Sequence, residues 1–163
     1  MNKIYIIGIV ASGKTTLAKR LSEKLDIPWH ELDCIVYHMT EAGRYKRTPE
    51  EQVKVIREID EGEKWIIEGT YRESCQCLLD IADTVIFLDP PLWKRRIRIF
   101  TRFIKQQLGF EKCHYKSDLK MLGLMYKWTR DFEKNRMSFE TMINQYQAKL
   151  LILSNNTDIG FYK

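Results

Sequence analysis

The chain has 163 residues, of which 44% are hydrophobic and 30% are charged, and its net charge is +5. This length and composition suit one globular domain over 1–163, and no apolar run reaches the roughly 18 residues that a membrane helix needs. We therefore expect no membrane span and, because a strand begins almost at the first residue, no signal peptide and a cytoplasmic location. The positive charge suits anionic ligands, either nucleotides or nucleic acid.

The first feature along the chain is an apolar run over 3–8 that predicts a buried strand, followed by a glycine-rich loop and a helix over about 13–25. The loop reads Gly-Ile-Val-Ala-Ser-Gly-Lys-Thr over residues 8–15, which is the phosphate-binding pattern G-x-x-x-x-G-K-[ST]. This pattern is specific when a strand precedes it and a helix follows it, as they do here. The sequence therefore predicts a site for a nucleoside triphosphate.

Each residue type in this loop has a physical role in binding phosphate. The glycines allow successive backbone N–H groups to point inward, and the helix adds its positive N-terminal end. Lys14 is expected to reach the β- and γ-phosphates, and the Thr15 hydroxyl is expected to ligate Mg²⁺. The predicted nucleotide-binding residues in this part of the chain are Gly8, Ala11, Ser12, Gly13, Lys14, Thr15 and Thr16.

The remaining elements alternate between short apolar strands and helices. We expect strands over 29–32, 65–67, 84–88 and 150–153, a polar loop over 40–47, and helices over 48–62, from 92 to about 108, from 118 into the 130s and over 138–148. Thr48, Pro49 and Glu51 form the signature of a capped helix start. The helix after Pro91 is expected to bury an apolar stripe made of Trp93, Ile97, Phe100, Ile104 and Leu108.

Alternating strands and helices predict an α/β fold with a five-stranded parallel sheet flanked by helices. Ligands bind such sheets beyond the carboxyl ends of the strands. The residues just past those ends are the phosphate-binding loop, Asp33, the segment 68–72, Asp89 and the segment 154–156. Acids and cations around a triphosphate site are what phosphoryl transfer requires.

The helix after Asp89 is strongly basic. Arg95, Arg98, Arg102 and Lys105 share one helical face, and no acidic residue lies between residues 94 and 105. A solvated face usually mixes charges of both signs, and arginine suits phosphoryl oxygens. We interpret this face as a phosphate clamp, with contact to nucleic acid as the alternative.

These motifs resemble the P-loop nucleoside monophosphate kinases, adenylate kinase above all, and within them the group labelled DNA topology modulation proteins. The stretches that carry the resemblance are 8–16, 32–33, 65–72 and 83–102. The resemblance implies a P-loop kinase fold with a lid, here helical and placed at about 103–130. It implies ATP and Mg²⁺ as cofactors, a small-molecule acceptor as partner, and an adenine loop at Asn155.

The resemblance also implies roles for individual residues. The motif 68–72 places Glu68 near Mg²⁺ and Arg72 on the acceptor, and Arg98 and Arg102 begin the lid. Arg130 and Arg136 are candidates for further lid arginines. Asp33 stands where shikimate and gluconate kinases hold a substrate hydroxyl, and for such an acceptor it is the expected base.

Two departures bear on the acceptor: Glu68 stands where adenylate kinases have Asp, and the Ser/Thr-Gly-Asp signature of AMP binding is missing. The leading hypothesis is an ATP-dependent kinase for a small acceptor, with a nucleotide as the favoured acceptor. The alternatives are a small-molecule hydroxyl kinase resembling shikimate or gluconate kinase, and a nucleotide-binding regulatory protein that affects DNA topology. No DNA-reading motif is visible, so DNA is not the favoured partner.

Overall fold

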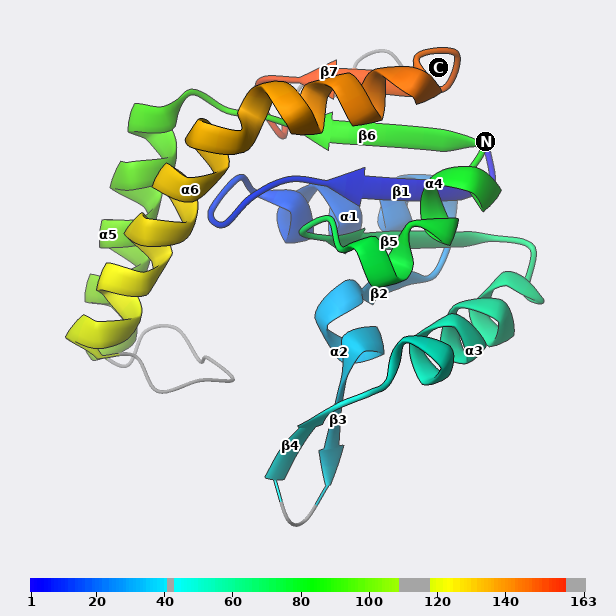
Figure 1. Cartoon of the computed structure of the whole chain (residues 1–163), viewed down its shortest axis with the longest axis horizontal. Coiled ribbons are helices and arrows are strands. Elements are labelled where there is room, and N and C mark those ends of the chain that lie inside the picture. Colours follow the sequence, from blue (N-terminus) through cyan, green and yellow to red (C-terminus); the bar gives the residue numbers. More distant parts are fainter. Residues whose placement is uncertain (41–42, 109–117, 158–163) are drawn as a thin grey trace.

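The computed structural model describes residues 1–40, 43–108 and 118–157, and its centre is a parallel sheet with the strand order β2-β5-β1-β6-β7 (Figure 1). The five strands are β1 (Lys3–Ile7), β2 (Trp29–Glu31), β5 (Trp65–Gly69), β6 (Thr84–Leu88) and β7 (Leu150–Leu153). All four strand pairings are parallel. The predicted α/β fold is therefore confirmed.

Helices cover both faces of this sheet. They are α1 (Lys14–Leu25), α2 (Leu32–Val36), α3 (Pro49–Asp60), α4 (Cys77–Ile81), α5 (Leu92–Gln107) and α6 (Leu119–Ile143), with short 3₁₀ turns at Glu73–Cys75 and Asn144–Tyr146. Along β1, Tyr5 and Ile7 belong to one buried cluster, whereas Ile4 and Ile6 pack with Leu17 of α1 in another. Burial on both faces explains why the strands are almost continuously apolar.

The start of α3 agrees with its predicted cap. The Thr48 hydroxyl accepts a hydrogen bond from the backbone N–H of Glu51 at 3.3 Å, and the Glu51 carboxylate accepts one from the N–H of Thr48 at 2.8 Å. Pro49 occupies the first turn, where its missing N–H costs nothing. This reciprocal capping satisfies two backbone donors that the helix itself leaves unbonded.

The polar segment 40–47, expected to be a loop, is instead largely part of a β-hairpin. Strands β3 (Tyr37–Thr40) and β4 (Gly43–Lys46) pair in antiparallel fashion and extend away from the main sheet (Figure 1). Arg47 anchors the base of the hairpin by donating to the backbone carbonyl of Cys34 at 2.8 Å. The prediction was wrong because cross-strand pairing, which polar residues make as well as apolar ones, decides this segment.

Helix α5 is rotated relative to the prediction. Its inward face carries Arg95 and Ile99, each 1% exposed. The stripe that was expected to be buried is between 40% and 64% exposed, and its members are Trp93, Ile97, Phe100, Ile104 and Leu108. The predicted burial of the stripe was therefore wrong: the basic residues on the other face find carboxylate and carbonyl partners in the body of the protein.

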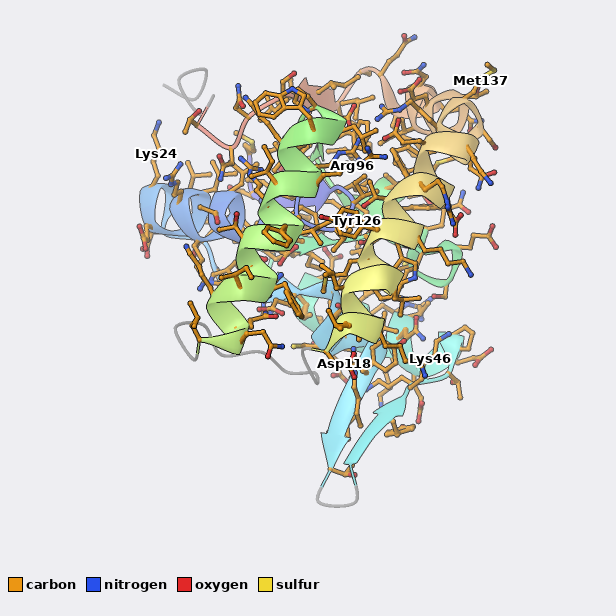
Figure 2. The ribbon with its side chains drawn as sticks, turned by 90° about the vertical axis from the view of Figure 1, so that its left-hand side faces the viewer. Lys24, Lys46, Arg96, Asp118, Tyr126 and Met137 are labelled. Carbon is orange, nitrogen blue, oxygen red and sulfur yellow. The ribbon has the colours of Figure 1, made fainter. Side chains whose placement is uncertain are left out.

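The two helical stretches expected after residue 118 form one long helix, α6, followed by the 3₁₀ turn at Asn144–Tyr146. Asp118 caps α6 by accepting a hydrogen bond from the N–H of Met121 at 2.8 Å. Helices α5 and α6 lie side by side, and the Tyr126 hydroxyl donates to the backbone carbonyl of Arg96 at 3.2 Å (Figure 2). Of the predicted lid over 103–130, residues 109–117 lie outside the described residues.

A close approach between β5 and α2 sets the position of α2. A Cβ atom placed on Gly69 would lie 2.4 Å from the Cβ atom of Leu32, so only glycine allows α2 to pack this tightly against the strand. We expect Gly69→Ala to lower the free energy of unfolding by about 2 kcal/mol, because neither backbone can move freely. Urea denaturation measures this change.

The matched control for that change is Gly123→Ala in α6, where a new Cβ would meet no atom within 4 Å. Removing glycine from a helix interior should stabilise the protein by about 0.5–1 kcal/mol. Equal effects of the two alanines would contradict the close-approach argument.

Candidate active site

The loop between β1 and α1 contains two residues whose backbone φ angles are positive. Ala11 has a φ of 59°, and Gly13, the N-cap residue of α1, has a φ of 100°. Gly13 thus adopts a left-handed conformation that strains any residue with a Cβ atom. No side chain caps the helix at Gly13, so the N–H groups of the first turn remain available to a phosphate. Gly8 is buried directly after β1, and Thr16 is exposed in the first turn of α1.

Lys14 folds back across this loop. Its Nζ donates to the backbone carbonyl of Ile9 at 2.9 Å. Burial lowers the pKa of Lys14 below its ordinary value, Glu68 and Asp33 partly oppose that change, and Arg102 adds to it. Three of the other predicted site residues therefore lie within electrostatic reach of the Lys14 ammonium.

The two predicted metal-binding residues are in direct contact. The Thr15 hydroxyl donates to Oε1 of Glu68 at 2.6 Å, although 53 positions separate them in the sequence. Glu68 is 5% exposed, and burial raises the pKa of its carboxyl group, whereas Lys14 and Thr15 oppose the rise. A hydroxyl and a carboxylate are hard oxygen ligands of the kind Mg²⁺ binds, so this pair fits that ion.

A second set of charges lies beside this pair, at the carboxyl ends of β2 and β5. The strand register places Glu31 opposite Glu68. Asp33 lies in the first turn of α2, which begins at Leu32, the residue predicted to be the last of the preceding strand. Arg72 donates to Oδ1 of Asp33 at 2.8 Å, and the Asp33 side chain is 62% exposed. The structure thus brings Asp33 and Arg72 together on an open side of the site.

Helix α5 contributes Arg98 from the opposite side. The Arg98 guanidinium donates to the backbone carbonyl of Ser12 at 2.7 Å, so it is in contact with the phosphate-binding loop. Arg102 follows one turn later on the same face and is close enough to influence the pKa of Lys14. Three residues of the basic face of α5, Arg95, Arg98 and Arg102, are therefore turned toward the body of the protein, whereas Lys105 at the end of that face is exposed.

The segment after β7 contacts both α5 and α1 next to the phosphate-binding loop. Asn155 accepts a hydrogen bond from Nζ of Lys94 at 3.1 Å, and the carbonyl of Asn156 accepts one from Arg20 at 3.3 Å. A Cβ atom on Gly13 would lie 3.1 Å from Nδ2 of Asn156. Asn156 is thus close to the loop, although the sequence reasoning selected Asn155; only its place in the segment 154–156 could have indicated it.

An ion-pair network that the sequence reasoning missed holds α5 and α6 to the end of β6. Arg136 donates to both carboxylate oxygens of Asp89, at 2.7 and 3.1 Å, and Asp89 with Glu133 raises the pKa of Arg136. Glu133 also pairs with Arg95, whose side chain is 1% exposed. The sequence carried no local signal for this network, because 38 positions separate Arg95 from Glu133 and 47 positions separate Asp89 from Arg136.

This network yields a stability prediction. Glu133→Ala leaves the buried Arg95 guanidinium without its carboxylate, which should lower the free energy of unfolding by about 2 kcal/mol, less than for a fully buried pair because Glu133 is partly exposed. Urea denaturation measures the loss.

The control variant is Glu140→Ala, which removes a more exposed carboxylate from Arg136 in the same helix. Its cost should stay below about 0.5 kcal/mol. Similar losses in both variants would show that burial of Arg95 does not carry the effect.

Comparisons with known proteins identify the fold through structure alone. No family model matches the chain, and no curated protein matches its sequence. A shikimate kinase from Acinetobacter baumannii, solved in complex with shikimate, has a TM-score of 0.55 at 14% identity and covers 94% of this chain and 82% of its own. A shikimate kinase from Bacteroides thetaiotaomicron has a TM-score of 0.52 at 18% identity and covers 98% of this chain and 89% of its own.

Within the described part of the chain, no helix combines the length and the apolar character that crossing a bilayer demands. The similarity to those two structures extends over at least 94% of this chain and therefore includes the parallel sheet and its flanking helices. The chain therefore has the P-loop kinase fold that the shikimate kinases share.

Proposed function

We propose that the protein is a P-loop kinase that transfers the γ-phosphoryl group of ATP to a small acceptor. The observation that carries this proposal is the contact between Thr15 and Glu68 beside Lys14, with the Asp33–Arg72 pair facing the same edge of the sheet. A nucleotide hydrolase needs only the first group of residues. A second, separate set of charged residues suits a second substrate.

The residues of the chain divide the work of phosphoryl transfer among them. The amides of the loop and the Lys14 ammonium bind the phosphates, and Thr15 with Glu68 would hold Mg²⁺, which neutralises phosphate oxygens when bound. Arg98 and Arg102 approach from α5 and offset the charge that develops on the transferred group. We assign Asn155 and Asn156 to the border of the nucleotide base, because their segment reaches the phosphate-binding loop through Asn156.

The acceptor side admits two kinds of substrate. For a hydroxyl acceptor, Asp33 takes the proton as the hydroxyl oxygen bonds to the γ-phosphorus and the bond to the β–γ bridging oxygen breaks, releasing ADP. For a nucleotide whose phosphate is the acceptor, no base is needed. The exposed carboxylate of Asp33 and the fold shared with shikimate kinases favour the hydroxyl acceptor.

The orientation of α5 weighs against a DNA-binding regulatory role. Arg95 is buried against Glu133, and Arg98 is bonded to the loop, so these residues do not form an exposed basic face. A protein that binds nucleic acid through charge needs its cations at the surface. The basic residues of α5 are better explained as part of the phosphate site.

The first functional prediction concerns Lys14. Lys14→Ala removes the ammonium that the loop motif assigns to the β- and γ-phosphates, and ATP turnover should fall at least about a hundredfold. The measurement is ADP release under saturating ATP, with Lys19→Ala, on the solvent side of the same helix, as the control. A folded Lys14→Ala protein with near-normal turnover would end the kinase proposal.

The second functional prediction separates the kinase from a DNA binder. Replacing both Arg98 and Arg102 with Ala should reduce kcat severely, because the phosphates lose their contacts from α5. The control removes the same charge from two exposed positions of α5 by replacing both Arg96 and Lys105 with Ala, and it should leave kcat within about twofold.

Both double variants are also titrated with duplex DNA at physiological salt. We expect weak, strongly salt-dependent binding that differs little between them. Tight DNA binding that disappears only in the Arg98/Arg102 variant, with phosphoryl transfer intact, would refute the assignment of these residues to the phosphate site.

A further inference from the structure

The apolar stripe of α5 lies on the outside of the molecule. Its members are Trp93, Ile97, Phe100, Ile104 and Leu108, each between 40% and 64% exposed. Figure 1 shows α5 at one end of the molecule, and Figure 2, which looks onto that end, shows α5 in front of the sheet. Residues three and four apart are neighbours on a helix, so the stripe is one continuous apolar surface. Such surfaces mark places where a protein meets a partner.

The spacing of the stripe is that of a helix that packs along a second helix. Trp93, Ile97, Phe100 and Ile104 follow one another at intervals of four, three and four residues. This is the alternation of the a and d positions in a coiled-coil heptad, which keeps one seam turned toward a partner helix. The pattern therefore favours a helix as the occupant of the stripe.

The stripe is complementary to itself when two copies of α5 run antiparallel. The pairs Ile97 with Ile104 and Trp93 with Leu108 have the same midpoint, between residues 100 and 101. A twofold axis beside Phe100 therefore sets each residue of a pair opposite the other residue in the second copy. A twofold interface requires this reciprocity, because residue i must meet residue j wherever j meets i.

The charges beside the stripe favour the antiparallel arrangement over the parallel one. Lys94 and Arg96 flank the N-terminal half of the stripe, and α5 contains no acidic residue that could pair with them. Parallel copies would bring these cations against their own counterparts, which is unfavourable. Antiparallel copies set them beside the C-terminal half, where Thr101 and Phe103 are uncharged and the end of the helix dipole is negative.

The cations on the other face of α5 argue against a lipid surface as the occupant. An amphipathic helix binds an anionic membrane through basic side chains that its polar face exposes to the headgroups. Here Arg95 is buried against Glu133, and Arg98 donates to the carbonyl of Ser12. These two cations are engaged inside the protein, so the stripe lacks much of the charge that such a helix uses.

The exposed surface is large enough for a specific dimer. Leu119 adds to the stripe, because it is 74% exposed and lies two helical turns before Tyr126 on the side of α6 that contacts α5. A large apolar side chain has about 200 Å² of surface, so these half-exposed side chains present roughly 600 Å² in each copy. Two copies would bury roughly 1,200 Å², which is where specific interfaces begin.

We propose that the protein forms a twofold-symmetric dimer in which the α5 stripes of two copies pack antiparallel, with Phe100 beside the axis. This inference does not rest on the proposed kinase function. It gives the two faces of α5 separate tasks: the face with Arg98 contacts the phosphate-binding loop, and the opposite face binds the second copy.

The test measures the dimer dissociation constant of the full chain by sedimentation equilibrium. The proteins are the wild type, Ile97→Glu, the double variant Ile97→Glu with Ile104→Lys, and Met137→Glu. Met137 is the control, because it is an 81% exposed apolar residue of α6 that Figure 2 shows away from α5. Both changed positions of α5 are exposed within one copy, so every variant should fold, and urea denaturation checks this.

We expect the wild type to be a dimer at micromolar concentration and Ile97→Glu to raise the dissociation constant at least about tenfold, because it buries an unpaired charge in the seam. Met137→Glu should change the constant by less than a factor of about two. The double variant should recover part of the lost affinity, because in antiparallel copies the introduced glutamate of one meets the introduced lysine of the other. In parallel copies each introduced charge would meet its own kind, and the double variant would be the weakest.

Four outcomes would overturn the inference. They are a wild type that stays monomeric at every concentration, a dimer that Ile97→Glu leaves intact, equal weakening by Ile97→Glu and Met137→Glu, and a double variant that recovers nothing. Flotation with vesicles of phosphatidylcholine and phosphatidylserine examines the lipid alternative. A monomeric wild type that binds these vesicles, and loses them in Ile97→Glu, would assign the stripe to a membrane surface and refute the dimer.

Discussion

The parallel pairing of β1 with both β5 and β6 is the constraint on which the rest of the structure depends. Ile7, the last residue of β1, lies opposite Gly69 on one side and Phe87 on the other. The three strands therefore end at the same edge of the sheet. Glycine backbone or a charged side chain stands at each of these ends, at Gly8, Gly69 and Asp89. The contact between Thr15 and Glu68 follows directly from this register.

The helices at that edge are held by charge as well as by apolar packing. Helix α5 turns Arg95 and Arg98 inward, where Arg95 pairs with Glu133 and Arg98 donates to the carbonyl of Ser12. Arg136 of α6 pairs with Asp89 beside them. Buried cations that lack such partners would cost several kcal/mol each. The network thus sets the rotation of α5, and this rotation brings Arg98 to the phosphate-binding loop.

The same rotation leaves the apolar side of α5 exposed, with Trp93 60% and Leu108 64% accessible. A helix with one apolar and one basic face has two ways to pack, and the pattern of its sequence favours burial of the apolar face. In this protein the basic face is buried instead, because its arginines find partners in Glu133 of α6 and in the loop after β1. The hairpin of β3 and β4 shows a similar effect, because its cross-strand pairing sets the Arg44 guanidinium over the ring of Tyr37.

Local sequence was sufficient for those parts of the protein that depend on near neighbours. The G-x-x-x-x-G-K-[ST] loop, the apolar strands and the Thr48–Glu51 cap were all predictable, because backbone conformation and short-range hydrogen bonds decide them. Contacts between distant segments were decided only by the tertiary structure: the packing of Leu32 against Gly69, the rotation of α5, the hairpin that carries Arg44, and the Asp89–Arg136 pair. The physical reason is that each of these depends on which charges and surfaces the folded chain brings within a few ångströms, and spacing along the sequence does not carry that information.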